Sequence, residues 1–361
     1  MAETLVALRD VVVRYGNSIA LDIAALDLYP REILAIIGPN GGGKSTLLRV
    51  MGMLQRPTGG TVRFCGADAF NENSLRLRRR IATVFQEPLL LNATVQENAA
   101  LGLRLRGVSK GEVARRLEPW LERLGIAHLR FRSARSLSGG EAQRTSLARS
   151  LVLEPEILLL DEPFAALDPA SREALLRDFQ PIVRESRITT VFVTHDRNEA
   201  FTLAGRVAVL HHGRLLQIGA REEVFRRPAN KAVAEIVGVE NRLPGVVEEC
   251  EKDLSTIRVG QNKLKVQGKF QPGVKVVVCL RPEEIAVSRE NSHASNSTAL
   301  MGTITGVSSS VLHQRITLDC GGVEIVALLE RKVGYGLGLA EGDVVTVSYS
   351  FNAAHLIVNQ G

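Results

Sequence analysis

The chain has 361 residues but few aromatic side chains, only 4% of the total, and a single tryptophan. Its four cysteines are widely spaced and form no C-x-x-C pair: Cys65, Cys250, Cys279 and Cys320. This spacing argues against a disulfide framework or a cysteine metal site, and it favours a reducing, cytosolic setting. No apolar run reaches the roughly 18 residues that a membrane-spanning helix needs, and the first residues show no signal-peptide pattern. Any membrane association is therefore expected to come through a partner.

Positive charge is in modest excess, with a formal net charge of +6 and an isoelectric point near 9.3. The one dense basic run, Arg76 to Arg80, has no neighbouring aromatic residue that could stack on a base. A solvated helix face explains it better than a nucleic-acid surface does, so no nucleic-acid partner is expected. With 45% hydrophobic and 23% charged residues, the composition is that of a soluble globular protein of two or three domains.

A glycine-rich segment with the pattern G-x-x-x-x-G-K-[ST] lies between an apolar run, Ile33 to Ile37, and a helix-compatible run, Leu47 to Met51. The segment comprises Gly38, Pro39, Asn40, Gly41, Gly42, Gly43, Lys44, Ser45 and Thr46. Strand, loop and helix in this order are the context that gives the pattern its mechanism. The alternative is a glycine-rich turn that binds nothing, but the complete motif and its flanks favour a nucleotide site.

The chemistry of this loop suits a polyphosphate. Glycines let successive backbone N–H groups turn inward around the phosphates, and the following helix adds the partial positive charge of its N-terminus. Lys44 is expected to reach the β- and γ-phosphates, and the Ser45 hydroxyl is expected to ligate Mg²⁺. The sequence therefore predicts that the chain binds a nucleoside triphosphate.

Polar residues follow several apolar strands downstream. Asp161 and Glu162 follow the run Ile157 to Leu160, and His195 follows the run Thr189 to Thr194. Apolar strands with intervening helices and active groups at strand ends predict a doubly wound, largely parallel α/β sheet. Asp161 is expected to hold Mg²⁺, and Glu162 to polarise an attacking water.

Each of these residues also has an ordinary explanation. An acidic pair after a strand is often only a helix cap, and a histidine after a buried strand is often a hydrogen-bonded core residue. Gln86, after the apolar run Ile81 to Phe85, taken alone is an unremarkable polar loop residue. The phosphate loop shifts the balance for the acidic pair. Gln86 could contact the metal and the attacking water, and His195 offers a side chain near the γ-phosphate.

A second anion cradle is predicted at Ser138, Gly139 and Gly140, where Ser138 and Glu141 have the spacing of a capping box at a helix start. Two phosphate cradles and one nucleotide pocket suggest a sandwich of two copies. Tyr15 precedes Gly16 in a turn, where a tyrosine is usually only a surface residue. Here it is a candidate for the flat surface that an adenine needs.

Near residue 240 helical patterns give way to short β runs with Gly and Pro between them. The region repeats itself weakly, since Asn241 to Val247 resembles Thr298 to Ile304, and Pro272 to Val278 resembles Glu341 to Val347. The polar stretch from Arg289 to Ser297 separates the halves. A tandem of small β-barrels, each too small to be very stable alone, is the expected fold.

Together, these motifs resemble the ABC transporter ATPase family over roughly residues 4 to 238. The resemblance rests on Leu137-Ser138-Gly139-Gly140-Glu141 with Gln143-Arg144, Asp161-Glu162-Pro163, Ala166-Leu167-Asp168 and Thr194-His195-Asp196. It implies a P-loop ATPase domain with antiparallel β and helical subdomains, active with ATP and Mg²⁺. It also implies a head-to-tail homodimer, in which the Ser138-Gly139-Gly140 signature of one copy closes the phosphate loop of the other.

The resemblance assigns roles residue by residue. Tyr15 would stack on adenine, Gln86 would couple ATP to membrane subunits, and Asp168 would link the two sites. Glu162 would be the catalytic base, and His195 the γ-phosphate switch. One departure is Arg31, where the family usually has glycine.

With one ATPase unit (1–238) and a β-rich C-terminal domain (239–361), the chain is similar to ATPases of bacterial and archaeal importers. Those serve integral-membrane permease subunits, and indirectly a solute-binding protein, from the cytoplasmic face of the cell membrane. Their C-terminal domains, called transport-associated OB-like domains, occur with sugar, polyamine, iron, sulfate and molybdate systems. Four segments resemble the molybdate and tungstate group: Leu89 to Val95, Val239 to Gly245, Cys279 to Glu284, and Ala353 to Ile357.

Two alternatives stay open. The C-terminal domain either senses an oxyanion or only stabilises the dimer, because Ser295-Asn296-Ser297-Thr298 lacks the arginine that molybdate-binding domains often carry there. The ATPase could also be a soluble one that acts on nucleic acid or ribosomes. Such proteins usually fuse two ATPase units or carry long coiled-coil insertions, and this sequence shows neither.

Overall fold

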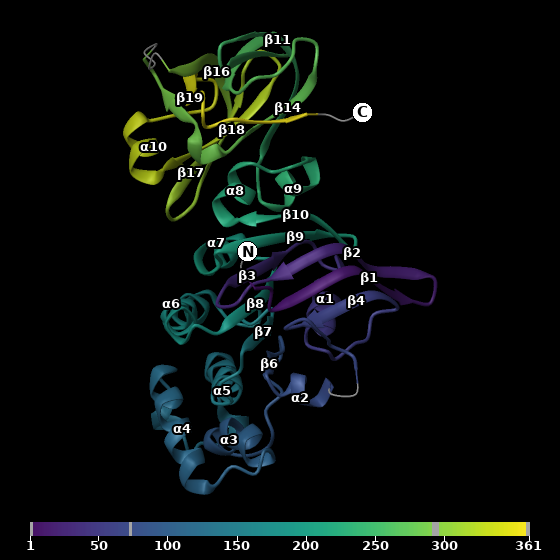
Figure 1. Ribbon diagram of the computed structural model, residues 1–361. Coiled ribbons are helices and arrows are strands. Elements are labelled where there is room, and N and C mark those ends of the chain that lie inside the picture. The colour runs from purple at the N-terminus through teal and green to yellow at the C-terminus, as the bar shows by residue number, and fades with distance from the viewer. Residues whose placement is uncertain (1–2, 72–73, 291–295, 359–361) are drawn as a thin grey trace. The chain divides into compact units, whose positions relative to one another are not determined.

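The computed structural model describes residues 3–71, 74–290 and 296–358. By its internal contacts the chain divides into two compact units between Arg221 and Glu222 (Figure 1). The sequence-based boundary at 238/239 falls later than this division. The two helices α8 (Arg221–Arg226) and α9 (Lys231–Ile236) lie before that boundary, yet they are tied to the C-terminal unit. Arg281 donates hydrogen bonds to the carbonyl oxygens of Phe225 and Val237, at the ends of these helices.

The first unit is built on a ten-stranded mixed sheet. In spatial order its strands are β5 (Ala67–Asp68), β4 (Gly59–Phe64), β1 (Val6–Tyr15), β2 (Ser18–Leu28), β10 (Arg214–Ala220), β9 (Arg206–His211), β3 (Ile33–Ile37), β8 (Thr189–Thr194), β7 (Ile157–Asp161) and β6 (Ile81–Val84). The five strands from β9 to β6 are parallel to one another, whereas β1, β2, β4 and β5 pair antiparallel. The parallel strands β3, β7 and β8 are almost wholly buried, because helices cover both faces of such a sheet.

The helices of this unit are α1 (Lys44–Met51), α2 (Ser74–Arg78), α3 (Val95–Leu105), α4 (Lys110–Arg123), α5 (Gly139–Leu151), α6 (Pro169–Ser186) and α7 (Arg197–Leu203). Two 3₁₀ turns, Ala127–Leu129 and Ala134–Ser136, connect α4 to α5. Helices α3, α4 and α5 contact one another and form the helical subdomain that the family resemblance implied. In the described part of the chain, no helix has the length and apolarity to cross a membrane.

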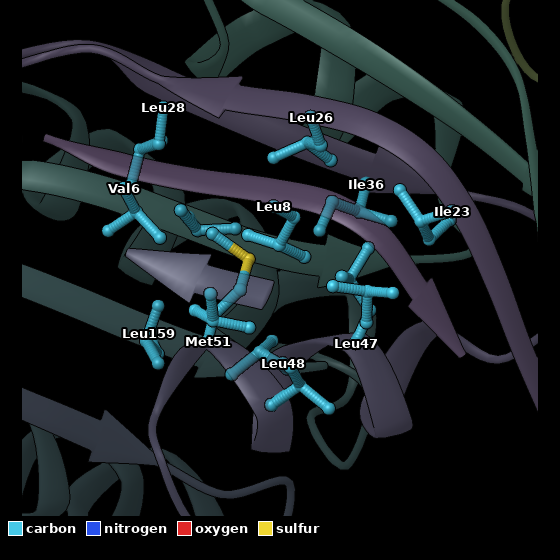
Figure 2. Packing of buried hydrophobic residues seen from close by; sticks show 14 of the residues in the cluster. Val6, Leu8, Ile23, Leu26, Leu28, Ile36, Leu47, Leu48, Met51 and Leu159 are labelled. Carbon is cyan, nitrogen blue, oxygen red and sulfur yellow. The ribbon is translucent and has the colours of Figure 1, made fainter. Parts of the chain in front are cut away.

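The helix that follows the phosphate loop is fixed by a buried cluster. Figure 2 shows Leu47, Leu48 and Met51 of α1 directed toward apolar side chains of the sheet, among them Leu8, Ile23, Leu26, Ile36 and Leu159. These come from β1, β2, β3 and β7, so the core that anchors α1 draws on both the antiparallel and the parallel strands. Burial of this apolar face holds the start of α1 at the edge of the sheet.

The second unit contains two five-stranded antiparallel sheets. One has the order β13 (Asn262–Gln267), β12 (Leu254–Val259), β11 (Asn241–Glu251), β14 (Lys275–Leu280), β20 (His355–Val358). The other has the order β15 (Ala286–Ser288), β19 (Val344–Ser350), β16 (Ser297–Ser309), β17 (His313–Asp319), β18 (Glu324–Glu330). A 3₁₀ turn, Pro282–Glu284, and helix α10 (Arg331–Leu337) complete the unit.

The two repeats exchange their last strands. In chain order β11 to β14 form the first sheet, but the next strand, β15, pairs with β19 of the second sheet. Conversely β20, which follows the second set, pairs with β14 of the first. One continuous hydrophobic cluster contains side chains of both halves, including Ile257 and Ile316. The repeat seen in the sequence is therefore confirmed, but the halves form one interlocked core and not two separate barrels.

Most local expectations hold. The P-loop α/β fold with antiparallel and helical subdomains and the β-rich C-terminal domain are confirmed. The sheet is mixed, because β1, β2, β4 and β5 add an antiparallel block to the expected parallel one. Residues 291–295, which include Ser295 and most of the predicted polar break, lie outside the described residues.

Candidate active site

The functional candidates meet because parallel strands end at a common edge of the sheet. Ile37 of β3 pairs in register with Thr194 of β8, and Asp161 of β7 pairs with Val193 of β8. The residue after each strand end therefore emerges at the same edge, where ligands bind in doubly wound sheets. This register places the start of the phosphate loop, Glu162 and His195 side by side.

The phosphate loop follows β3 and packs closely against β2, β9 and the turn between β9 and β10. A side chain at Gly38 would place its Cβ 2.0 Å from the carbonyl oxygen of Leu210, so only glycine fits there. Gly43 caps α1 with a φ of +97°, and a Cβ there would meet the carbonyl oxygen of Ala20 at 2.7 Å. The amide of Gly213 donates to the carbonyl of Gly42, which braces the loop. The glycines thus allow the close backbone approach that a phosphate cradle requires.

Lys44 is the first residue of α1, and its side chain is only 6% exposed. Its ammonium donates to the carbonyl oxygens of Gly38 and Pro39, each at 3.0 Å, and lies 4.0 Å from Oε1 of Glu162. Burial lowers the pKa of Lys44, while the carboxylates of Glu162 and Asp161 act in the opposite direction. The structure thus holds a desolvated cation inside the curve of the loop.

Ser45 and Asp161 form a pair of hard oxygen donors. The Ser45 hydroxyl donates to Oδ1 of Asp161 at 3.0 Å, and burial raises the pKa of that carboxyl group. Adjacent oxygens around an octahedral Mg²⁺ with metal–oxygen distances of about 2.05 Å are about 2.9 Å apart. Two donors at this spacing, one of them a carboxylate, therefore fit neighbouring ligand positions of a magnesium ion.

Glu162 and His195 contact each other directly. Nδ1 of His195 lies 3.1 Å from Oε2 of Glu162, so an N–H there donates to the carboxylate. Glu162 has a φ of +46°, a left-handed conformation that is uncommon for a residue with a side chain, and its amide donates to the carbonyl of Val193. Such strained backbone clusters at functional sites, where the surrounding structure enforces it.

Two other predicted residues lie at the periphery in this structure. Gln86 is exposed and follows β6, the strand that pairs with β7. Tyr15 ends β1 with a side chain 52% exposed, and its hydroxyl donates to Oε1 of Gln55 at 2.7 Å. Both are accessible, as a residue that meets a ligand or partner needs to be, but neither contacts the cluster around Lys44.

Ser138, Gly139 and Gly140 are not part of the cluster around Lys44. Ser138 caps α5, and the predicted capping box is confirmed because Ser138 and Glu141 exchange hydrogen bonds. The nearest groups to a Cβ at Gly139 are Leu167 and Ala166, and at Gly140 the nearest is Ser171. The signature therefore lies beside the loop that carries Asp168, the N-cap of α6, and its serine is exposed.

A polar network behind His195 was not predicted from the sequence. Arg172 of α6 forms ion pairs with Asp196 and with the buried Glu199, and the Thr194 hydroxyl donates to Glu199 at 2.5 Å. Burial raises the pKa of Glu199. The network connects the helix capped by Asp168 to the loop of His195. Only the i to i+3 spacing of Asp196 and Glu199 offered a signal, and it indicates a helix start and nothing more.

A tight glycine loop with a buried lysine, opposite two carboxylates and a histidine at strand ends, defines a P-loop nucleoside triphosphatase. Comparison with known families narrows the class. The family model described as ABC transporter matches residues 21–165. The chain is 33% identical to a spermidine/putrescine import ATP-binding protein of Nitrosomonas europaea, covering 98% of this chain and 99% of the relative. It is 34% identical to a molybdate/tungstate import ATP-binding protein of Pyrococcus abyssi, over 91% and 93% respectively.

The chain therefore belongs to the ABC transporter family, as an ATP-binding and ATP-hydrolysing subunit of the importer type. Solved structures agree. The cbiO1 protein of Clostridium perfringens, part of an ABC transporter complex, matches 65% of this chain and 94% of its own with a TM-score of 0.58 and 30% identity. The ATP-binding cassette MJ0796, solved as a dimer after hydrolysis with ADP and phosphate, matches 60% and 98% with a TM-score of 0.55 and 30% identity.

Proposed function

We propose that the residues at the sheet edge form the hydrolytic half-site of an importer ATPase, with Glu162 as general base. The observation that carries this proposal is the single cluster of Lys44, Ser45, Asp161, Glu162 and His195 around the phosphate loop. Lys44 binds the β- and γ-phosphates, since it is the buried cation enclosed by the loop. The remaining loop residues, Gly38 to Gly43 and Thr46, supply the helix start and, except for Pro39, backbone N–H groups.

Mg²⁺ would be held by Ser45 and Asp161, with Gln86 as a further oxygen ligand, and when bound it neutralises charge on the phosphates. Glu162 takes the proton of the attacking water as the water approaches the γ-phosphate. His195, hydrogen-bonded to Glu162, keeps that carboxylate in one orientation and presents its ring to the γ-phosphate. The left-handed backbone at Glu162 aims the side chain back toward Lys44.

One copy provides only part of this site. Ser138 to Gly140 pack against Ala166 and Leu167 and expose the capped start of α5. We expect them to bind the γ-phosphate held by the loop of a second copy, in a homodimer formed with ATP. Asp168, beside the signature, would connect the two sites, and Tyr15 would stack on the adenine. A related cassette was solved as a dimer, which supports this arrangement.

The proposed partners are integral-membrane permease subunits, which this ATPase would serve at the cytoplasmic face of the membrane, with Gln86 in the coupling contact. A solute-binding protein would act indirectly. For the solute we propose an oxyanion, tungstate or molybdate, because relatives from two Pyrococcus species carry that description at 34% identity. Polyamine import is the second candidate, because spermidine/putrescine relatives match at 32–33% identity over nearly the whole chain.

The Glu162→Gln variant tests the catalytic assignment. Loss of a general base lowers turnover by about 10²- to 10⁴-fold, while ATP binding persists. We expect this variant to accumulate as an ATP-bound dimer on size-exclusion chromatography, and Lys44→Ala to lose ATP binding. Glu122→Gln, at an exposed position of α4 outside the site, serves as the charge-matched control. Normal ATP hydrolysis by Glu162→Gln would show that another residue is the base.

Uptake measurements test the solute. Cells that lack this protein should lose high-affinity tungstate or molybdate uptake and regain it when the wild type, but not Glu162→Gln, is supplied. The same cells should take up spermidine, sulfate and maltose normally. Unchanged oxyanion uptake together with lost polyamine uptake would replace the first candidate by the second.

A further inference from the structure

A pocket of about 600 Å³ opens within the C-terminal unit, and none of its lining residues belongs to the ATPase site. The charged residues and the histidine of its lining are Arg226, Arg227, Lys269, Arg281, Glu284 and His355. A volume of this size lies within the range of small-molecule binding sites, about 300 to 1,000 Å³. It is far larger than one tetrahedral inorganic anion needs.

Besides residues 225–227 and 267–270, three segments that are distant in the sequence meet in the walls of this pocket. They are Val239, the stretch from Cys279 to Glu284, and the stretch from Ala353 to Leu356. The fold brings them together because β20 pairs antiparallel with β14, with Cys279 opposite His355. Arg281 then fixes the preceding helices by donating to the carbonyl oxygens of Phe225 and Val237. The walls are therefore built by the tertiary structure and do not depend on one loop.

The charge of the lining is strongly positive. Four of its side chains are cations and only Glu284 is an anion. Lys269 lies 3.2 Å from Asp253, and Arg281 lies 3.5 Å from Glu283, so these two are partly compensated. Arg226 is exposed and, within the described residues, forms no ion pair. Cations gathered in a concave site raise the local concentration of anions and can donate charge-assisted hydrogen bonds to them.

The rest of the lining is apolar. Phe225, Phe270 and Leu356 contribute carbon surface beside the charged rim. Nε2 of His355 lies 3.2 Å from the carbonyl oxygen of Pro228, to which an N–H there donates, and burial lowers the pKa of this histidine. The ring is thus neutral near pH 7 and leaves Nδ1 as an acceptor. A ligand that carries both a charged head and a carbon body matches this combination.

We infer that this pocket is a binding site for a small phosphate-bearing organic anion. The cationic rim, with Arg226 and Lys269, binds the phosphate head, and the aromatic walls of Phe225 and Phe270 contact the carbon body. The site is independent of the ATPase assignment, since it shares no residue with the phosphate loop or the signature. It gives the C-terminal unit a ligand of its own, distinct from the transported solute.

Three probes dissect the two halves of this recognition: phenyl phosphate, which has head and body, inorganic phosphate, which has only the head, and phenol, which has only the body. Binding to the full-length protein is measured by isothermal titration calorimetry. A ligand as small as phenyl phosphate is expected to bind with a dissociation constant of about 1 mM or lower. Inorganic phosphate should bind about tenfold more weakly, since it makes no contact with the aromatic walls. Phenol should show no binding. The same titration on Lys44→Ala excludes the phosphate loop as the binding site.

The double variant Arg226→Glu with Lys269→Glu reverses the charge of the pocket rim and changes no core side chain. It should weaken phenyl phosphate binding by about tenfold to a hundredfold. Lys275→Glu with Lys332→Glu changes the net charge equally, but at exposed positions outside the pocket, and should bind like the wild type. The inference fails if wild type shows no binding of phenyl phosphate, if the rim variant binds it unchanged, or if inorganic phosphate binds equally well.

Discussion

Among the non-glycine residues of the ATPase unit that have a left-handed backbone, Glu162 and Arg31 differ in what this conformation does. Glu162 has a φ of +46° and directs its carboxylate to His195 and Lys44. Arg31 has a φ of +64° in the turn before β3, and its side chain is exposed. Its amide donates to the Thr189 hydroxyl, a contact that any residue with a backbone N–H can make. Strain at Arg31 therefore serves no visible purpose, in contrast to Glu162.

Replacing Arg31 by glycine should stabilise the ATPase unit. Relief of the left-handed strain, about 1–2 kcal/mol, exceeds the extra entropy that glycine loses on folding, about 0.5–1 kcal/mol. We expect a net gain of about 0.5–1 kcal/mol in the free energy of unfolding, measured by urea titration. Arg31→Ala removes the same side chain but keeps the strain, so it should show no gain. Equal stabilisation by both variants would assign the effect to the side chain instead.

Glu199 predicts a pH dependence of stability. Its carboxyl group is buried, so its pKa in the folded state is raised above the ordinary value of 4.5. Between the two values the folded state holds a proton that the unfolded state has released, so stability falls as pH rises through this interval. Glu199→Gln keeps an oxygen acceptor for the Thr194 hydroxyl but has no proton to lose.

The measurement compares urea unfolding of Glu199→Gln and wild type across a pH series that starts near Glu199's unfolded-state pKa. The stability of the variant relative to wild type should increase with pH and then level off above the folded-state pKa. A difference that stays constant over the series would mean that Arg172, which lies 3.8 Å from Glu199, keeps the carboxylate ionised throughout.

At the level of elements, the strands and helix starts that depend on residues adjacent in the chain were predicted well from the sequence. The buried strands β7 and β8 follow from apolar runs, and the start of α5 follows from the capping box at Ser138. The apolar residues of strand β1 fall in two short runs, because Arg9 and Asp10 interrupt the apolar pattern. Pairing with β2 on one side and β4 on the other carries the strand through this interruption, with a break in the register beside Asp10.

Contacts between elements distant in the sequence were not predictable. The segment that follows Gln86 has little regular structure, yet two side chains fix it. Arg149 of α5 donates to the carbonyl oxygens of Pro88 and Leu89, at 2.7 and 3.0 Å. Asn98 of α3 is fully buried and bonds both the amide and the carbonyl of Leu91. Neither residue has a local pattern that distinguishes it from any polar residue in a helix.

Asn98 should therefore contribute more to stability than its place in an ordinary helix suggests. In Asn98→Leu the volume is kept, but the amide and carbonyl of Leu91 lose buried partners, at a cost of about 2–4 kcal/mol in total. Asn92→Leu, at an exposed position of the same segment, should change stability by less than about 0.5 kcal/mol. Urea unfolding compares the two, and amide exchange at Leu91 should accelerate only in Asn98→Leu. Equal effects of the two variants would contradict a structural role for the buried amide.

On the scale of the whole chain, the exchanged strands determine how the C-terminal unit unfolds. Each half is closed by a strand from the other, β20 on β14 and β15 on β19, and the two sheets share one hydrophobic cluster. Small β-barrels bury too little apolar surface to be stable alone, and a shared core removes that limitation. The exchange therefore predicts that the two halves unfold together, although the sequence repeat alone suggests two modules.

Leu356 in β20 tests this cooperativity. It is 5% exposed and belongs to the shared cluster, whereas Val358 in the same strand is 44% exposed. Leu356→Ala should destabilise the unit by about 2–4 kcal/mol through the cavity it leaves, and Val358→Ala by less than about 0.5 kcal/mol. Because β16 to β19 share the core with β20, their slowest amide protons should exchange faster in Leu356→Ala by the same free-energy difference as those of β11 to β14. If the change stays confined to β14 and its neighbours, the halves are independent barrels and the shared core contributes little to their stability.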